Sequence, residues 1–297
     1  MTPAVPVPDI DSRDGGALGA AVSALWELTH VLRVECPWDQ VQTAGTIVPH
    51  TLEEAWEVAD VARVAQARDD AGETPELAEF EDELGDLLFQ VCFLAMWCGE
   101  RDAEIDLGTV ARRIFAKLVR RHPHVFGDEV TATDADEVRG AWERVKREKE
   151  SRGLFEGIPN AMPPLGRARK VQSRAAGVGF EYGDVRAALA DLEDEVRELR
   201  EAIDAAEAAG TLPTGEQAPP DAHTEAELGD VLFAAVNVAR FLRVDPELAL
   251  HDSTAVFQRR VERATELAQA AGEPFDTLAI DAQEAYYQRA KAELNAN

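Results

Sequence analysis

Two stretches of the chain carry acidic residues in the same order and spacing. In the first, Leu-Glu-Glu-Ala-Trp-Glu at 52–57 precedes Glu-Leu-Gly-Asp at 83–86, and in the second, Asp-Glu-Val-Arg-Glu at 194–198 precedes Glu-Leu-Gly-Asp at 227–230. Corresponding acids are 141 residues apart before the connecting loop and 144 after it, so only the loop has changed length. This pattern predicts an internal duplication.

The spacing of these acids favours a metal site. Residues three apart share one face of a helix, so each half brings two pairs of carboxylates together if its two helices pack antiparallel. Converging oxygen ligands suit Mg²⁺, for which Mn²⁺ can substitute. The eight candidate ligands are Glu54, Glu57, Glu83, Asp86, Glu195, Glu198, Glu227 and Asp230.

Neither a solvated helix face nor a di-iron site fits these acids as well. Glu-x-x-Glu also occurs at Glu76 and Glu79, and a single such pair is usually a solvated helix face. A solvated face has no reason to repeat Glu-Leu-Gly-Asp ahead of an apolar run in both halves. A di-iron bundle requires Glu-x-x-His on two helices, and we expect no histidine on the ligand helices. The pattern as a whole therefore favours Mg²⁺ and phosphate chemistry.

Helices are expected to position these acids, and the fold class to be all-α. Apolar residues recur with helical spacing almost everywhere, and no alternating strand pattern competes with them. Breaks at 69–75, 153–166 and 210–220 separate the helical segments. Each half is therefore expected to be a helical bundle of about four or five helices.

The duplication divides the chain into two tandem domains. We expect a disordered N-terminus at 1–17, a first domain at 18–150, a linker at 151–166 and a second domain at 167–297.

Two further pairs of residues repeat between the halves. Asp106 and Asp245 each precede an apolar helical pattern and are expected to cap equivalent helices. Gly85 and Gly229 lie inside the ligand helices, where glycine is costly unless a close helix crossing requires it.

The composition argues against several kinds of partner. The formal net charge is −27, from 57 acids against 30 bases, which argues against nucleic acid or an anionic membrane surface as the main partner. The sequence has no run of 18 apolar residues and no charged-then-apolar leader, so we expect the protein to stay in the cytoplasm. An anionic substrate would need metal ions to bridge it to these acids.

Each half also carries a basic and aromatic set. Lys117, Arg120 and Arg121 fall within about one helical turn, positioned to grip outer phosphates, although an amphipathic helix with snorkelling bases is the alternative. The aromatic rings of Trp38, Phe180 and Tyr182 could stack on a base or belong to the core. The other members are Trp142 and Lys146 in the first half, and Arg259, Arg260, Tyr287 and Lys291 in the second.

Longer motifs connect the chain with a known family. The sequence contains Cys36-Pro-Trp-Asp-Gln-x-Gln-Thr43, Arg120-Arg-His-Pro-His-Val-Phe126 and Lys170-Val-Gln-x-Arg-Ala-Ala176. It closely resembles the MazG family of nucleoside triphosphate pyrophosphohydrolases, from about residue 18 to the end. The resemblance implies two tandem all-α domains, a homodimer, Mg²⁺ dependence, and hydrolysis of nucleoside triphosphates to monophosphates and pyrophosphate, which cleans the nucleotide pool.

The resemblance also implies roles for individual residues. The ligand roles carry over to the eight acids above, and Glu53 and Asp194 are candidates for orienting the attacking water or supporting the ligands. Our hypothesis is that this water, activated by Mg²⁺, attacks the α-phosphorus and pyrophosphate leaves. The implied substrate contacts are Trp38, Lys117, Arg120, Arg121, Trp142, Lys146, Lys170, Arg174, Phe180, Arg259, Arg260, Tyr287 and Lys291.

The second half departs from the family pattern on its substrate side. The family has a lysine before Phe-x-Arg-Arg and a tryptophan before the last basic residue, but here these positions hold Val256 and Tyr287.

Two alternative functions stay open. One is a narrower hydrolase acting on deoxyuridine or phosphoribosyl-ATP substrates. The other is a metal-stabilised helical dimer that binds nucleotides or a partner protein without turnover.

Overall fold

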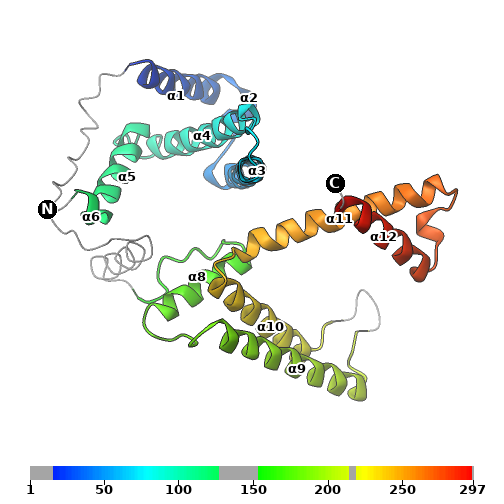
Figure 1. Cartoon of the computed structure of the whole chain (residues 1–297). Helices are drawn as coiled ribbons and strands as arrows, with labels where there is room; N and C mark the ends of the chain where they lie inside the picture. The colour runs from blue at the N-terminus through cyan, green and yellow to red at the C-terminus, as the bar shows by residue number, and fades with distance from the viewer. Residues whose placement is uncertain (1–15, 127–152, 214–218, 296–297) are drawn as a thin grey trace. The chain divides into compact units, whose positions relative to one another are not determined.

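Helices make up the chain in the computed structural model, which describes residues 16–126, 153–213 and 219–295. Throughout these ranges the elements are helices joined by short connections, and no strand occurs among them. The chain divides into two compact units, Met1–Lys146 and Arg147–Asn297 (Figure 1). The prediction of an all-α fold is confirmed. Across the described residues, no helix combines the length and apolar character that a membrane span requires.

A helical hairpin forms the centre of the first unit. The unit contains α1 (Ala17–Glu35), α2 (Pro37–Gln40), α3 (Ala44–Asp70), α4 (Ala78–Gly99), α5 (Leu107–Arg121) and α6 (Pro123–Phe126). Helices α3 and α4 pack against each other, and α1 packs on α4. Ile47 on α3 and Phe93 on α4 are each 1% exposed, so apolar burial holds the hairpin together. The hairpin connection falls at the break predicted around 69–75.

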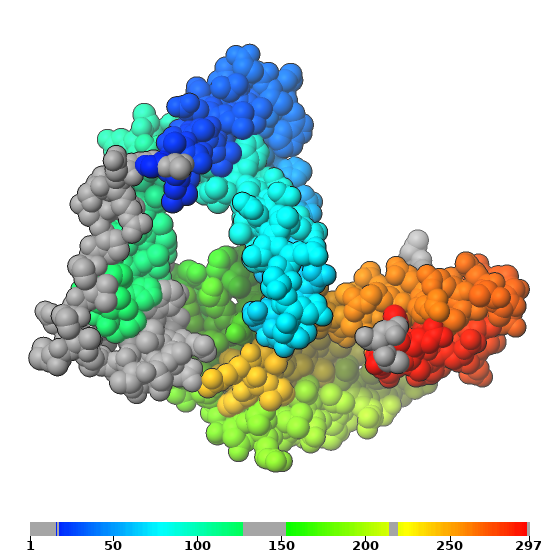
Figure 2. Space-filling view, turned by 45° about the horizontal axis from the view of Figure 1, so that its top comes forward, coloured from blue at the N-terminus to red at the C-terminus, as the bar shows by residue number. Residues whose placement is uncertain are grey.

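Two helical hairpins form most of the second unit. The unit contains α8 (Pro164–Ala176), α9 (Val185–Ala209), α10 (Ala222–Phe241), α11 (Pro246–Ala270), the 3-10 turn η1 (Phe275–Thr277) and α12 (Ile280–Asn295). Helix α9 packs on α10, and α11 packs on α12 (Figure 2). Small residues such as Ala188, Ala264 and Ala290 are fully buried, which permits close helix approach. Gln172 on α8 donates from Nε2 to the carbonyl oxygen of Phe233 on α10, at 2.7 Å.

Side-chain caps begin equivalent helices in both units. Asp106 accepts a hydrogen bond from the amide of Thr109 at 2.6 Å, at the start of α5. Asp245 accepts from two backbone amides at the start of α11, with Pro246 in the first helical position. The cap prediction for Asp106 and Asp245 is confirmed. Thr43 and Asp184, which are 141 residues apart, cap α3 and α9 in the same way.

The two glycines of the repeated motif lie on open helix faces. A Cβ atom at Gly85 or at Gly229 would meet nothing within 4 Å. Within either unit, no close helix crossing requires glycine at these positions. Glycine at these positions instead leaves the helix surface beside the acids uncovered.

Candidate functional site

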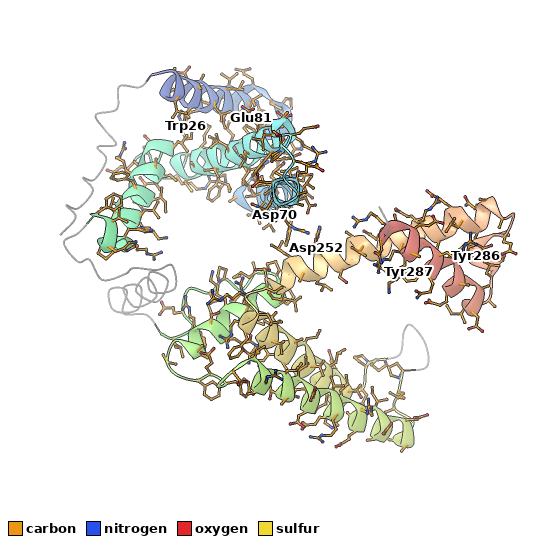
Figure 3. The ribbon with its side chains drawn as sticks, in the orientation of Figure 1. Trp26, Asp70, Glu81, Asp252, Tyr286 and Tyr287 are labelled. Atoms are coloured by element: carbon orange, nitrogen blue, oxygen red, sulfur yellow. The ribbon has the colours of Figure 1, made fainter. Side chains whose placement is uncertain are left out.

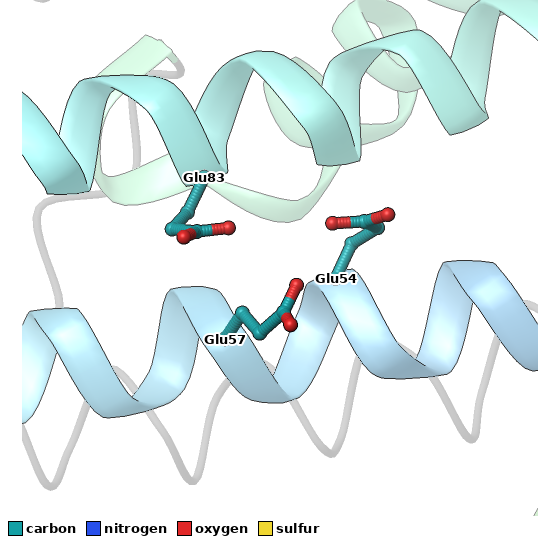
Figure 4. Close-up of side chains that lie close together, drawn as sticks. All are labelled: Glu54, Glu57 and Glu83. Carbon is teal, nitrogen blue, oxygen red and sulfur yellow. The ribbon is translucent and has the colours of Figure 1, made fainter.

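Three glutamates from two helices come together in the first unit. Glu54 and Glu57 extend from α3, and Glu83 extends from α4 to meet them (Figure 4). One carboxylate oxygen from each residue lies within 4.8 Å of the other two. Glu54 and Glu83 are half-buried, whereas Glu57 is exposed. A single divalent cation has room to contact all three residues, and their hard oxygen donors suit such an ion.

The second unit repeats this arrangement at the equivalent positions. Glu195 and Glu198 on α9 and Glu227 on α10 each place one carboxylate oxygen within 4.8 Å of the others. Their exposure follows the same order, because Glu195 and Glu227 are half-buried and Glu198 is exposed. The duplication seen in the sequence therefore extends to the spatial arrangement of the side chains.

Repulsion between acids characterises the first cluster. Burial, a hydrogen bond with Glu57 and repulsion by Asp86 raise the pKa of Glu54. Burial and repulsion by Glu57 and Asp86 also raise the pKa of Glu83. The buried Gln90 opposes this effect, because its hydrogen bond to Glu54 favours the charged carboxylate. Gln90 was not among the predicted site residues, although a glutamine four residues after Asp86 on the same helix face was the available signal.

The second cluster contains an additional acid. Burial, followed by repulsion from Asp230, Glu198 and Asp191, raises the pKa of Glu195. Asp191 lies one turn before Glu195 on α9 and also hydrogen-bonds the hydroxyl of Tyr182, which raises the pKa of that tyrosine. Asp191 was also not predicted, and its signal was its place on the ligand face of α9.

The remaining predicted acids lie at the edges of these clusters. Asp86 and Asp230 are exposed and stand outside the two groups of three, which they influence through their charge. Glu53 places Oε2 3.1 Å from Nδ1 of His50. Asp194 lies 3.4 Å from the guanidinium of Arg197. Metal ligation by the two aspartates and water orientation by Glu53 and Asp194 stay predictions.

The expectation that the ligand helices carry no histidine is wrong. Helix α3 includes His50, and α10 includes His223, because both helices begin well before their acidic motifs. Nδ1 of His223 lies 3.4 Å from Oε1 of Glu227. Neither histidine follows a glutamate by three residues, so the Glu-x-x-His pattern of a di-iron site is still missing from the ligand helices.

Those predicted substrate contacts of the first unit that the structure describes lie on α2 and α5. Trp38 on α2 is 51% exposed, and its ring centroid lies 5.7 Å from that of His50. Lys117, Arg120 and Arg121 lie on α5, the helix that follows ligand helix α4. Trp142 and Lys146 lie outside the described residues.

The second unit gathers part of its predicted set on α11 and α12. Tyr287 lies on α12 (Figure 3), and its ring centroid is 5.8 Å from that of Phe257 on α11. Arg260 donates to Oδ1 of Asn295 at 3.4 Å. The exposed side chains of Arg259 and Lys291 complete the set on these helices.

The predicted contacts around α8 are divided between surface and structural positions. Phe180 is 83% exposed, and Lys170 is also exposed. Arg174 instead donates from Nη1 to the carbonyl oxygens of Leu154 and Glu156, at 2.9 and 2.7 Å. These bonds hold the segment before α8, a role that the prediction of substrate contact did not include.

Comparison with known proteins identifies the family. A model described as the MazG nucleotide pyrophosphohydrolase domain matches residues 42–126. A nucleoside triphosphate pyrophosphohydrolase from Escherichia coli (strain K12) is 36% identical over 261 residues, covering 86% of this chain and 90% of that protein. The chain belongs to the MazG family. The resemblance inferred from its motifs is confirmed.

Further MazG relatives come from Thermotoga maritima. A protein named nucleoside triphosphate pyrophosphohydrolase/pyrophosphatase MazG is 34% identical over 259 residues, covering 86% of this chain and 89% of that protein. A solved structure of a mazG-related protein is 26% identical, covers 42% of this chain and 99% of its own, and has a TM-score of 0.33. The matched MazG domain runs from just before α3 to the end of α6, so it contains the whole first glutamate cluster.

Proposed function

We propose that this MazG chain hydrolyses nucleoside triphosphates and deoxynucleoside triphosphates to monophosphates and pyrophosphate, with Mg²⁺ as its cofactor. The observation that carries the proposal is the occurrence of two matching groups of three glutamates, each gathered within 4.8 Å. The relatives from Escherichia coli and Thermotoga maritima, which align along most of the chain, are named for this activity.

The donor set fits a hard divalent cation. Each group offers carboxylate oxygens alone. The pKa values of Glu54, Glu83 and Glu195 are raised first by burial and then by neighbouring acids, and a bound cation would relieve the repulsion between these acids. We propose that the three glutamates of each group, with Asp86 or Asp230 beside them, hold the ion. When bound, Mg²⁺ would stabilise charge on phosphate oxygens and acidify water, and Mn²⁺ would serve similarly.

Other side chains would position the reactants. Glu53 and Asp194 each precede the first glutamate of a cluster, and we propose that they accept hydrogen bonds from the water that attacks the α-phosphorus. Guanidinium and ammonium groups would offset the charge of the departing pyrophosphate. The exposed ring of Trp38, held beside ligand helix α3, would stack on the base.

We propose that two copies of the chain form the active protein. Leu84, Leu88 and Val91 lie on ligand helix α4 and are 48%, 39% and 39% exposed. Apolar side chains beside functional acids indicate a surface that a second chain covers. Light scattering should give twice the mass of one chain, and Leu88→Asp should shift the protein toward monomer. A monomeric wild-type protein at micromolar concentration would contradict this part.

Product analysis on a nucleotide panel tests the activity. The full chain would be incubated with Mg²⁺ and each of the common ribo- and deoxyribonucleoside triphosphates, with deoxyuridine triphosphate and phosphoribosyl-ATP included. Equal amounts of monophosphate and pyrophosphate are expected, because cleavage at the α-phosphorus releases both. Orthophosphate as the main product would contradict the proposal. Nucleotide binding without any turnover would favour the non-enzymatic alternative.

A further inference from the structure

In each unit, the segment leading into the first ligand helix carries an aromatic residue that contacts this helix. The ring of Trp38 lies against His50 on α3, with centroids 5.7 Å apart. The hydroxyl of Tyr182 hydrogen-bonds Asp191 on α9. His50 and Asp191 each stand four residues before the first glutamate of their cluster, on the same helix face. An aromatic side chain therefore lies at the same end of both acid clusters.

The two aromatic residues do not occupy equivalent positions of the duplication. His50 and Asp191 are 141 residues apart and correspond to each other, but the counterpart of Trp38 is Gly179, and that of Tyr182 is Val41. Each unit thus places an aromatic ring beside its cluster from a different sequence position.

In the first unit, Arg33 fixes the segment that carries Trp38. Its side chain is 13% exposed, and it binds both carboxylate oxygens of Glu100, at the end of α4, at 2.6 and 3.0 Å. Nη1 also donates to the carbonyl oxygens of Asp39 and Gln42, the latter at 2.9 Å. Gln42 in turn donates to the carbonyl of Trp38 at 3.0 Å. Four hydrogen bonds from one guanidinium thus tie this segment to ligand helix α4.

In the second unit, an arginine on ligand helix α10 holds the segment that carries Tyr182. Arg240, near the end of α10, is 15% exposed and donates to Glu181 at 2.5 Å. Glu181 is the residue directly before Tyr182. Two further bonds to Oδ1 of Asn237, at 3.1 and 2.9 Å, hold the Arg240 guanidinium in place. Here the segment before α9 carries the acid and ligand helix α10 carries the base, whereas in the first unit α1 carries the base and the acid lies at the end of α4.

We propose that Arg33 and Arg240 are positioning residues, which lock these two segments so that Trp38 and Tyr182 present a stacking surface to the nucleobase of the substrate. The proposal rests on the proposed function, since it assumes that a nucleoside triphosphate binds with its phosphates at the glutamates. The guanidinium of Arg33 binds backbone carbonyls near Trp38, and that of Arg240 binds the residue before Tyr182. Both bonds restrict the motion of the segment that carries the aromatic residue. The aromatic side chain then loses little conformational freedom when a base binds.

Binding measurements separate this role from a structural one. The full chain carrying Asp230→Ala, which leaves the first site intact, would be titrated calorimetrically with an α,β-methylene nucleoside triphosphate and with inorganic tripolyphosphate, both with Mg²⁺. Arg33→Met should weaken binding of the nucleotide about tenfold, as expected for a lost base contact, and leave tripolyphosphate unchanged. Glu100→Gln, which keeps the backbone contacts of Arg33, should give a smaller loss of the same selective kind. Arg68→Met, which removes an exposed ion pair with Glu76, is the matched control and should change neither affinity.

A double variant decides whether Arg33 acts through Trp38. If it does, Arg33→Met should add no further loss of nucleotide affinity once Trp38→Ala is present. Additive losses, or equal losses for nucleotide and tripolyphosphate, would overturn the proposal.

The same scheme applies to the second unit. Asp86→Ala provides the background, Arg240→Met and Tyr182→Ala are the test variants, and Arg263→Met is the control. Exchange of the pair, as Arg240→Glu with Glu181→Arg, should restore nucleotide affinity if the ion pair holds the loop. Selective binding by a wild-type chain that does not hydrolyse nucleotides would sustain the positioning role while refuting the proposed activity. Failure of the wild-type chain to bind the nucleotide would refute both.

Discussion

The first glutamate cluster is supported by a buried amide, whereas the second is surrounded by additional charge. Gln90 donates to Glu54 in the first unit, but the equivalent position in the second unit holds the buried Ala234. Conversely, His50 of the first unit is replaced by Asp191, which adds to the repulsion on Glu195. The duplicated ligands have kept their geometry, while the groups that tune their charge have diverged.

A cation on α9 offsets part of the charge in the second unit. Arg197 pairs with Asp194 at 3.4 Å, Glu198 at 3.2 Å and Glu201 at 2.9 Å. The equivalent position in the first unit is Trp56. These ion pairs are exposed, so each contributes little to stability, but together they orient the acids next to the second glutamate cluster. The two glutamate clusters are therefore alike in arrangement, but the charged and polar groups around them differ.

The largest expected effect comes from disabling both clusters together. Asp86→Ala with Asp230→Ala should lower Mg²⁺-dependent turnover by more than about a thousandfold, because a lost metal interaction costs several kcal/mol of transition-state stabilisation. Both residues are exposed, so the fold should survive. Steady-state pyrophosphate release and circular dichroism check the two parts. A double variant that retains the wild-type rate would refute the ligand assignment.

Disabling one unit at a time should produce the next largest effect on turnover. The first unit has Lys117, whereas the equivalent position in the second unit holds Val256. We therefore expect the first unit to hydrolyse substrate, so that Asp230→Ala alone leaves measurable turnover. A lysine contact to phosphate is worth about tenfold to a hundredfold, so Val256→Lys in the Asp86→Ala background should raise kcat/KM by about tenfold. If Asp86→Ala keeps full activity and Asp230→Ala loses all of it, only the second unit is active, and Val256 in place of lysine does not impair it.

Local and repeated features of the sequence predicted the helical fold and the acids that gather in each unit. Helical periodicity and caps such as Asp106 depend on neighbours within one turn, and the Glu54 and Glu57 pair depends on helix geometry alone. Gln90 could not be predicted with the same ease, because its role depends on the rotation of α4 against α3. The structural bonds of Arg174 could not be predicted, because its carbonyl partners lie 18 and 20 residues upstream, a contact that no local pattern specifies.

Metal binding should stabilise the folded chain by a smaller amount. A cation that binds the native clusters stabilises them by mass action, by about 2.7 kcal/mol at a hundredfold excess over the dissociation constant. Calorimetric melting with Mg²⁺ and after chelation would measure the shift. The double variant Asp86→Ala with Asp230→Ala should show a reduced shift. A wild-type melting temperature indifferent to millimolar Mg²⁺ would count against metal binding by the free protein.

The smallest expected effect is a pH dependence of the stability of the metal-free chain, in which the two units have different neighbouring groups. The pKa values of Glu54 and Glu195 are raised on folding, so the native state holds these protons more tightly than the unfolded state. Their contribution to stability is therefore present at low pH and is lost as pH rises above the ordinary glutamate value of 4.5. Other carboxyls, including Glu100, have lowered pKa values and act in the opposite direction, so the effect must be measured against matched variants.

Glutamine substitutions isolate this contribution, because glutamine resembles the protonated acid. Without metal at pH 7, Glu54→Gln and Glu195→Gln should each raise the free energy of unfolding, by less than about 1 kcal/mol for such partly exposed groups. The gain should vanish near pH 4. Adding Gln90→Ala should enlarge the gain for Glu54, whose charged form accepts a hydrogen bond from Gln90. Urea denaturation of chelated protein at both pH values would measure these differences, and equal gains for Glu54→Gln with and without Gln90 would show that the amide does not distinguish the two sites.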